Sequence, residues 1–497
     1  MTAPDPSLWA ILAVMGPLIA GLLALEGRPW IIRLALALGS GSALAAAGGL
    51  WAGVSELGVI RHTLGGWGQP LGIEVRADGV AVVLLAMTAV VGGAISLYAT
   101  SYFGDLSHLE ARHSPAGRAA RYFAPLWLFL WAALNGIYLA GDLFNLYVML
   151  EVLGLAAAAV VTLAVTSKAT VAGMRYLMVS LVGSVFFLLG VALLYVAYGT
   201  LSLEGLAAAN PSGPLPAVAL GAMTVGLAAK TALFPFHAWL PPAHAAAPAP
   251  GSALLSALVV KGSFLILVRL WAEVYGGGSQ AGLLVLGVMG AGAIVWGSLL
   301  ALRQKSLKRL IAYSTVAQLG YLFVMFPLLF PEGGLPGGGD WNADAWAGGI
   351  YHALSHGVAK AAMFLAAGSM TYAVAEDALA SISGIAHRLP MTFFAFGLAG
   401  LSLAGIPPSG GFVAKWLLLR SAVATGGWHW AVLLVLGGLL TLAYVLMVLR
   451  YAVEQTETPA TFRPVPRRME WAAMGLALAS VLLGIQATGI LVLLEVR

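Results

Sequence analysis

The stretch "AAKTALFPFHAWLPPAHAAAPAP", residues 228 to 250, decides how this chain must be built. It continues directly from "LPAVALGAMTVGL", residues 215 to 227, which has the composition of the first half of a membrane helix. Lys230 then places an ammonium group inside the apolar span, and the prolines that begin at Pro235 remove helical hydrogen bonds. We therefore expect a helix broken at Pro235 and His237, beside protein or water that satisfies the freed carbonyl groups.

The whole chain has the composition of a membrane protein. Of its 497 residues, 60% are hydrophobic and 9% are charged, whereas soluble domains are about a quarter charged. Apolar runs of about 20 residues, the length that crosses a hydrocarbon core about 30 Å thick, recur from one end to the other. This pattern predicts an all-α polytopic membrane protein, with a single membrane domain over residues 1 to 497. The first run, 8 to 25, lacks a preceding basic segment, so we expect a membrane helix there and not a signal peptide.

Hydropathy predicts fourteen membrane spans, and the basic residues between them indicate the topology. Sixteen lysines and arginines lie in loops after odd-numbered spans, and at most five lie on the other side: Arg61, Arg76, Arg269, Arg420 and Arg497. By the positive-inside rule, both termini are expected on the outer side of the membrane. Topology also explains the basic balance of the chain, so no nucleic-acid partner is expected. The predicted spans are 8–25, 31–53, 79–102, 122–140, 143–165, 175–198, 217–239, 252–275, 282–302, 310–330, 346–373, 391–422, 430–452 and 471–494.

Four basic residues remain inside apolar spans, and all four are lysines. They are Lys230, Lys261, Lys360 and Lys415. Arginine stays protonated under nearly all conditions, whereas burial lowers the pKa of a lysine enough for proton exchange. The four lysines are therefore candidates for a titratable series. The alternative is that some reach the membrane interface or act as fixed structural charges.

Glu151 is an acidic residue in the same setting. It lies about nine residues into its span, in "GDLFNLYVMLEVLGLAAAAVV", residues 141 to 161, so an unpaired carboxylate would be costly and a lysine on another helix is its natural partner. Separating such a pair shifts the pKa of both groups and releases or takes up a proton. The alternative is a static ion pair that fixes helix packing. Asp142, at the start of the helix, is expected to be an N-cap.

His352, His356 and Lys360 follow one another at intervals of four residues in "GIYHALSHGVAKAAMFLAAG", residues 349 to 368. This spacing places them on one helical face. Because the pKa of histidine lies near working pH, a hydrated proton path is favoured over polar groups that only pack. No third ligand stands nearby in sequence, so no metal site is predicted. The absence of cysteine excludes thiolate metal sites and iron–sulfur clusters in this chain, and we expect any redox cofactor to belong to a partner.

A second interrupted span carries the same features as the first. "LSLAGIPPSGGFVAKW", residues 401 to 416, contains Pro407 and Pro408 and ends near Lys415. Two broken spans five helices apart suggest two repeats, spans 4 to 8 (122–275) and 9 to 13 (282–452). Because five is odd, these repeats would have inverted topology, as in many transporters. Coincidental kinks are the alternative.

Five motifs together carry a resemblance that covers nearly the whole chain. They are "DLFNLYVMLEV" (142–152), the stretch 228–269, "SLKRLIAYSTVAQLGYL" (306–322), "YHALSHGVAKAAMFLAAG" (351–368) and "LSLAGIPPSGGFVAKW". The chain resembles the antiporter-like subunits shared by Mrp-type multisubunit cation/proton antiporters, respiratory complex I and membrane-bound hydrogenases, and among these it most resembles the D-type subunits of Mrp antiporters. The resemblance implies proton-translocating roles for Glu151, Lys230, Lys261 and Lys415, with His352, His356 and Lys360 on a central hydrophilic axis.

The resemblance implies two functions between which the residues do not choose. In the first, the chain is the proton-translocating subunit of a multisubunit Na⁺ or K⁺/proton antiporter in a bacterial or archaeal cytoplasmic membrane, with other membrane subunits as partners and no cofactor of its own. In the second, it is a pump module driven by redox chemistry in partner subunits. A lipid-embedded scaffold without transport would leave the lysines and the broken helices unexplained.

Overall fold

The computed structural model describes residues 6–67, 72–104, 114–331, 334, 341–454 and 462–496. Arg112 and Arg497, which enter the loop count, lie outside these residues. The elements are α1 (Pro6–Ala24), α2 (Pro29–Leu57), β1 (Ile60–Leu64), β2 (Ile73–Ala77), α3 (Gly79–Tyr102), α4 (Pro115–Leu139), α5 (Leu143–Thr162), α6 (Ser167–Tyr198), α7 (Leu203–Ala209), α8 (Pro214–Thr231), α9 (Leu240–Ala246), α10 (Ala249–Leu254), α11 (Val260–Val268), α12 (Gln280–Leu302), α13 (Leu307–Leu329), α14 (Ala343–Val374), α15 (Ile385–Arg388), α16 (Pro390–Ala404), α17 (Gly410–Ala424), α18 (Trp428–Val453), α19 (Arg467–Ile485) and α20 (Ala487–Leu493).

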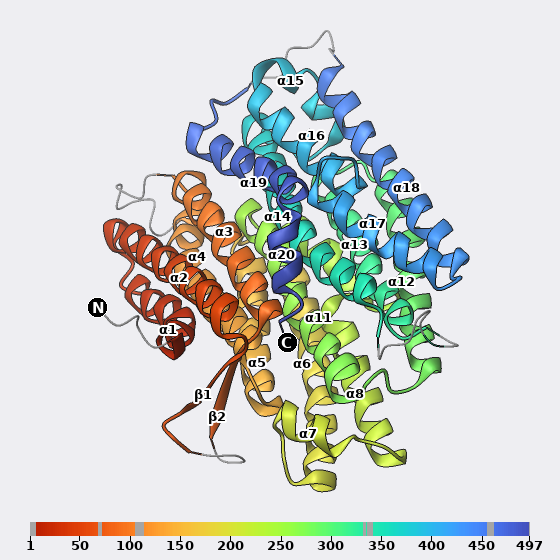
Figure 1. The fold of residues 1–497 in the computed structure, drawn as a ribbon. Coiled ribbons are helices and arrows are strands. Elements are labelled where there is room, and N and C mark those ends of the chain that lie inside the picture. The colour runs from red at the N-terminus through yellow and green to blue at the C-terminus, as the bar shows by residue number, and fades with distance from the viewer. Residues whose placement is uncertain are drawn as a thin grey trace.

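Helices pack side by side to form nearly all of the molecule (Figure 1). Within the described residues, thirteen helical segments are long and apolar enough to cross a membrane. The remaining predicted span, 391–422, is divided into α16 and α17, which have 15 residues each. The last predicted span is also divided, at Gln486 between α19 and α20. The prediction of an all-α polytopic membrane protein is confirmed.

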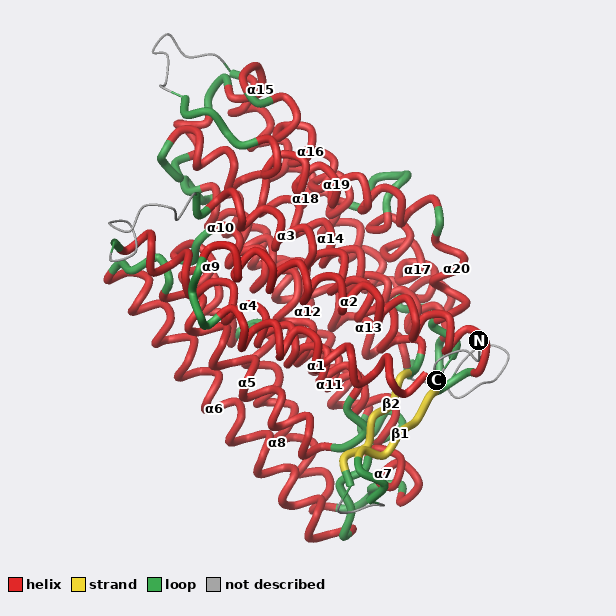
Figure 2. The backbone as a smooth tube through the Cα atoms, turned by 90° about the vertical axis from the view of Figure 1, so that its left-hand side faces the viewer, coloured by secondary structure: helices red, strands yellow, loops and turns green. Residues whose placement is uncertain are grey.

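The hairpin of β1 and β2 lies at one end of the bundle, beside the start of α3 and the last described residues of the chain (Figure 2). The two strands are antiparallel, with Ile60 opposite Ala77. The backbone N–H of Gly79, which opens α3, donates to the carbonyl of Val496 at 2.9 Å. The sequence indicated only a loop between two spans in this segment. The hairpin forms because its backbone groups pair with each other outside the helical layer.

The core of the molecule is α14, which other helices enclose along most of its length. It contacts α3, α10, α13, α16, α17 and α19. Small residues allow this close packing. At Gly357, an added Cβ would lie 2.5 Å from the Sδ atom of Met87 on α3, so a larger residue would require the Met87 side chain to move. Because α14 carries His352, His356 and Lys360, all three side chains are enclosed by protein.

The first predicted break lies where the sequence places it. α8 ends at Thr231, Ala232 adopts a left-handed conformation with φ of 58°, and the Phe234–Pro235 peptide is cis. A short 3₁₀ turn, Phe236–Trp239, follows and leads into α9. The indole N–H of Trp239 donates to the carbonyl of Ala229 at 2.9 Å. Protein therefore satisfies one of the carbonyl groups in the last turn of α8.

The second predicted break separates α16 from α17. Gly405 turns the chain with φ of 88°, the Pro407–Pro408 peptide is cis, and the side chain of Ser409 caps α17 by accepting from the N–H of Phe412. At Gly411, an added Cβ would lie 1.8 Å from the carbonyl oxygen of Ser402, so the two half-helices approach this closely only with glycine there. Both interrupted spans are confirmed, while the repeat boundaries 122–275 and 282–452 stay predictions.

Two π-helical turns interrupt the helix between α10 and Tyr275. They cover Leu255–Val259 and Arg269–Val274 and lie on either side of α11, which carries Lys261. Turns of this kind inside α-helices are frequent at functional sites, since they widen the helix and redirect side chains. Hydropathy gives no signal for them.

Candidate functional site

Lys230 and Glu151 form an ion pair that bridges α8 and α5. The Nζ atom of Lys230 lies 3.6 Å from Oε1 of Glu151. Two serines of α6 join the pair: Lys230 donates to Ser180 Oγ at 2.9 Å, and the hydroxyl of Ser184 donates to Glu151. The lysine side chain is 6% exposed and the glutamate 23%, so the pair is enclosed on the lysine side only. The glutamate thus has the lysine partner that its burial requires.

Hydroxyl groups continue from this pair toward α11. Thr231, next to Lys230, donates to Ser263 Oγ at 2.7 Å. Ser263 lies two residues after Lys261, on the same helix. This hydroxyl pair lies between the Lys230 and Lys261 positions and joins α8 to α11, while no side-chain hydrogen bond within the described residues joins it to either lysine.

Lys261 lies against His356 at the centre of the molecule. Its Nζ atom is 2.6 Å from Nδ1 of His356 and donates to the carbonyl of Ser256, in the preceding π-helical turn, at 2.9 Å. Both side chains are fully buried. This contact is an acid–base pair between two groups that each carry or release a proton.

The series of side chains that begins at Glu151 and Lys230 and includes Lys261 and His356 is called the polar row below. It continues from His356 to Lys415 through the rings of His352 and Tyr321. The rings of His356 and His352 have centroids 5.9 Å apart, and the ring of Tyr321 follows 5.3 Å beyond His352. The Nζ atom of Lys415 lies 4.1 Å from the centre of the Tyr321 ring. Lys415 also donates to the carbonyl of Leu403 at 2.7 Å. Leu403 lies in the last turn of α16, just before the break. The break therefore supplies the acceptor that holds the buried ammonium group.

Lys360 forms a branch of the row and not a step between the other lysines. It lies one turn beyond His356 on α14 and is fully buried. Its Nζ atom donates to the carbonyl of Ile311 at 3.1 Å and to the hydroxyl of Ser314. Both acceptors belong to the first turns of α13. The hydrogen bonds of Lys360 thus extend the polar row toward the end of the bundle at which α13 begins.

His244 is a buried histidine on this branch that the sequence patterns did not indicate. It is fully buried, and both of its ring nitrogens lack a hydrogen-bond partner among the described residues. Its electrostatic neighbours are Lys261, Lys308 and Lys360. Tyr321 was not predicted either. Each stands inside a motif quoted above, but only the fold brings His244 near Lys360 and Tyr321 near Lys415.

A group of four charges lies at the opposite end, where β2, α3 and the π-helical turn Arg269–Val274 meet. Arg269 donates to Asp78 at 2.8 Å and to Glu273 at 2.9 Å, and Arg76 contacts Glu273 at 2.8 Å. The count of basic residues placed Arg269 on the same side as Arg76. Its side chain lies in the last turns of the predicted span 252–275, at the end of the bundle that carries Arg76, and is 1% exposed because two carboxylates balance its charge there.

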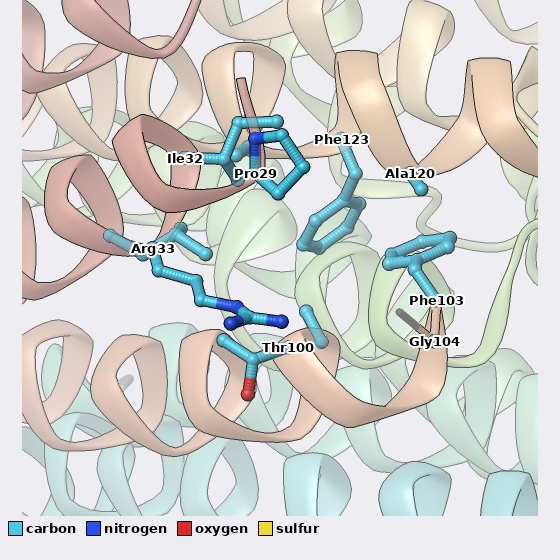
Figure 3. Close-up of a pocket in the computed structure, with 11 residues that line it drawn as sticks. Pro29, Ile32, Arg33, Thr100, Phe103, Gly104, Ala120 and Phe123 are labelled. Atoms are coloured by element: carbon cyan, nitrogen blue, oxygen red, sulfur yellow. The ribbon is translucent and has the colours of Figure 1, made fainter. Parts of the chain in front are cut away.

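Two cavities differ in whether residues of the polar row line them. One, lined by Arg33, Thr100, Phe103 and Phe123, has a volume of about 40 Å³, which is room for about one water molecule (Figure 3). It shares no lining residue with the row. The other has a volume of about 200 Å³ and lies between α16, α17 and α18, where Lys415 lines it. The Lys415 end of the row therefore faces open space.

Discontinuous helices and buried ionisable groups on the helices between them define the class of protein to which this chain belongs: polytopic helical membrane proteins built for moving ions. The family described as NADH:quinone oxidoreductase/Mrp antiporter, transmembrane, matches residues 140–441. The chain belongs to this family.

Relatives carry the names of both branches of the family. The chain is 35% identical over 461 residues to the N subunit of the NADH-quinone oxidoreductase of Desulforudis audaxviator, covering 91% of this chain and 87% of that protein. It is 30% identical over 421 residues to the D subunit of the Na(+)/H(+) antiporter of Alkalihalophilus pseudofirmus, covering 82% and 80%.

Two solved structures share the fold over the whole or nearly the whole chain. A chain of the Mrp complex from Dietzia sp. DQ12-45-1b matches with a TM-score of 0.87 and 25% identity, covering 100% of this chain and 97% of that chain. A chain of the membrane-bound sulfane sulfur reductase, an archaeal respiratory complex, matches with a TM-score of 0.83 and 25% identity, covering 99% and 96%.

Proposed function

We propose that this chain is the proton-translocating subunit of a multisubunit Na⁺ or K⁺/proton antiporter in the cytoplasmic membrane of a bacterium or archaeon. The observation that carries the proposal is the series of ionisable, hydroxyl and aromatic side chains from Glu151 to Lys415 on α5, α6, α8, α11, α14, α13 and α17, most of them buried. Charged and titratable groups are costly in a membrane and usually functional there. The Na(+)/H(+) antiporter relative and the Mrp complex support the antiporter branch.

In the proposed mechanism, a proton passes between titratable groups along this row. The hydroxyls of Thr231 and Ser263 link the Lys230 region to the Lys261 region. Lys261 and His356 then share a proton across their 2.6 Å contact. His352 passes the proton toward Lys415, whose ammonium group the Tyr321 ring and the Leu403 carbonyl stabilise.

Glu151 sets the proton affinity at the first end of the row. While its carboxylate stays near Lys230, the charged form of the lysine is favoured. When the pair separates, the lysine releases its proton more readily. Because the glutamate is the more exposed partner, a charge on a neighbouring subunit can draw it away from Lys230. This gives the subunit a means of coupling to the rest of a complex.

The two flanks of the molecule suit contact with other membrane subunits or lipid. On the Glu151 side, α5 and α6 expose large apolar residues such as Leu155 and Val185, and on the Lys415 side α17 and α18 expose Trp416 and Leu439. We infer that other membrane subunits cover these faces. We further propose, from the distribution of loop lysines and arginines, that both termini lie on the outer side.

A second function is supported by the identity of 35% to the NADH-quinone oxidoreductase relative. In this alternative, the same row serves as a proton-pumping module driven by redox chemistry in other subunits. The partners distinguish the two. Small membrane subunits that copurify with the chain favour the antiporter, whereas partners that contain iron favour the redox-driven complex. Neighbouring genes give the same information.

The test of the proposed function uses the whole purified complex in proteoliposomes with a pH-sensitive dye inside. Addition of Na⁺ or K⁺ is expected to move protons across the membrane, and Lys261→Met is expected to abolish the movement. Lys305→Met, which changes an exposed lysine, is the matched control and should transport normally. Transport by the Lys261→Met complex at the normal rate would contradict the proposal.

A further inference from the structure

A cavity outside the polar row lies at the end of the bundle that carries most of the loop lysines and arginines. Its volume is about 750 Å³, and its walls come from the start of α6, from α9 and from the start of α13. Three basic residues line it: Lys168, Arg175 and Arg309. The size suits a headgroup or another small polar ligand.

The positive charge of the cavity is only partly balanced. Within the described part of the chain, the side chains of Lys168, Arg175 and Arg309 form no ion pair. Asp377 is the one carboxylate in the lining, and it is already engaged by the hydroxyl of Ser306 and, at 2.9 Å, by the backbone N–H of Lys308. Three cations and one occupied carboxylate leave a site that attracts an anion.

Two helix N-termini add to this attraction. α6 begins at Ser167 and α13 at Leu307, and residues of both first turns line the cavity. The positive ends of helix dipoles favour negative charge within about one turn. The dipoles therefore act in the same direction as the three side chains.

The cavity opens onto an apolar surface along α6. Hydropathy placed Arg175 in a loop, but it lies in the third turn of α6, about 10 Å along the helix axis from Lys168. The same helix exposes about half of the surface of each of three apolar residues: Val171, Met174 and Met178. A ligand that fits this surface carries an anionic group next to long apolar chains.

We propose that this cavity binds the phosphate headgroup of an anionic phospholipid, with its acyl chains along the exposed face of α6. Basic pockets between membrane helices recognise such headgroups by charge. The bound lipid also contacts α9, because Pro242 and Ala245 line the cavity, and so holds the second half of the broken helix against α6. This inference goes beyond the proposed function and does not rest on it.

The test compares lipids on the full complex by native mass spectrometry. Phosphatidylglycerol is expected to stay bound at concentrations at which phosphatidylcholine does not. The triple variant Lys168→Gln, Arg175→Gln, Arg309→Gln is expected to weaken phosphatidylglycerol binding roughly a hundredfold, since each basic group near a membrane surface is worth about fivefold. Binding that is equal for the two lipids would overturn the proposal.

The matched control removes the same charge from the same end of the bundle. Arg118, Arg303 and Lys305 are exposed, and none of them lines the cavity. The triple variant of these residues to Gln should bind phosphatidylglycerol as the unchanged complex does, and an equal loss would mean that only general surface charge matters. If the first triple variant does not fold, the single variant Arg175→Gln is expected to lose about fivefold, and full retention there would overturn the proposal.

Two further outcomes identify other occupants. Displacement of phosphatidylglycerol by millimolar inorganic phosphate would show a site for a free anion and overturn the lipid proposal. A cross-link from Lys168 to an acidic segment of a partner subunit, at full occupancy in the complex, would show that protein fills the cavity and would also overturn it. Binding that persists in phosphate and the absence of such a cross-link are the expected results.

Discussion

The Nζ atom of Lys261 lies 2.6 Å from Nδ1 of His356, and protein encloses both side chains. At this distance the two groups share a hydrogen bond, so one of them is the donor and the other the acceptor. They do not both hold a full positive charge without strong repulsion, because protein screens charge far less than water does. The geometry therefore favours at most one positive charge on this pair, and the pair lies at the middle of the proposed path.

Replacing His356 tests whether this contact carries protons. His356→Leu is expected to lower proton transport by about a hundredfold, the size of effect usual for a lost acid–base group, with the amount of protein in the membrane unchanged. Thr371→Val, farther along the same helix, is the control, because within the described residues the Thr371 hydroxyl bonds only to the Gly368 carbonyl. Normal transport by His356→Leu would remove the histidine from the path.

Glu151→Gln tests the proposed control of Lys230. Glutamine keeps an acceptor for the hydroxyl of Ser184 but loses the charge that favours protonated Lys230. Cation-driven proton movement in everted vesicles is expected to fall severely while the complex still assembles. A variant with near-normal transport would show that the pair is static and only fixes helix packing.

Lys415→Arg separates a titrating role from a fixed charge. An arginine keeps the cation near the Tyr321 ring and still donates to the Leu403 carbonyl, but it does not release its proton at accessible pH. Transport is expected to fall at least as far as in Lys415→Met. Retained transport in the arginine variant would mean that Lys415 acts as a fixed charge.

The sequence predicted those features that one segment determines by itself. The prolines and glycines of the two interrupted spans predicted the breaks, and the span 79–102 matches the bounds of α3. The spacing of His352, His356 and Lys360 predicted a shared face. In each case, local backbone chemistry or helical periodicity is enough, because no distant residue changes the outcome.

Features that depend on contacts between distant segments were not predictable in the same way. Asp78 and Arg269 are 191 residues apart, and nothing near either residue indicates the other. His244 is in the opening stretch, but its lack of a hydrogen-bond partner within the described residues follows from how α9 packs near α14, where its ring lies against Phe364. The hairpin of β1 and β2 was missed because two short strands outside the membrane leave no mark in hydropathy.

The buried pair of Asp78 and Arg269 predicts a large effect on stability. Asp78→Asn removes one of the carboxylates that balance a fully enclosed guanidinium group, and breaking such a pair costs about 3–5 kcal/mol. We expect a clear fall in the melting temperature of the solubilised protein. Asp344→Asn is the control, because its pair with Arg420 is exposed and worth roughly 1 kcal/mol or less. Equal melting temperatures for the two variants would contradict this interpretation of the cluster.

The last prediction concerns the chain without its partners. Glu151 is the more exposed partner of its ion pair, and Lys415 lines a cavity on the opposite flank, so both ends of the row lie near surfaces that we propose neighbouring subunits cover. A proton that reaches either end therefore needs another chain to complete its passage. The purified chain is expected to fold in detergent, with the helix content of the complex by circular dichroism, but to show no Na⁺/proton or K⁺/proton exchange in proteoliposomes. The full complex, reconstituted at the same molar amount, should exchange. Exchange by the single chain at the rate of the complex would show that it is a self-contained antiporter and that the two lateral ends of the row need no partner.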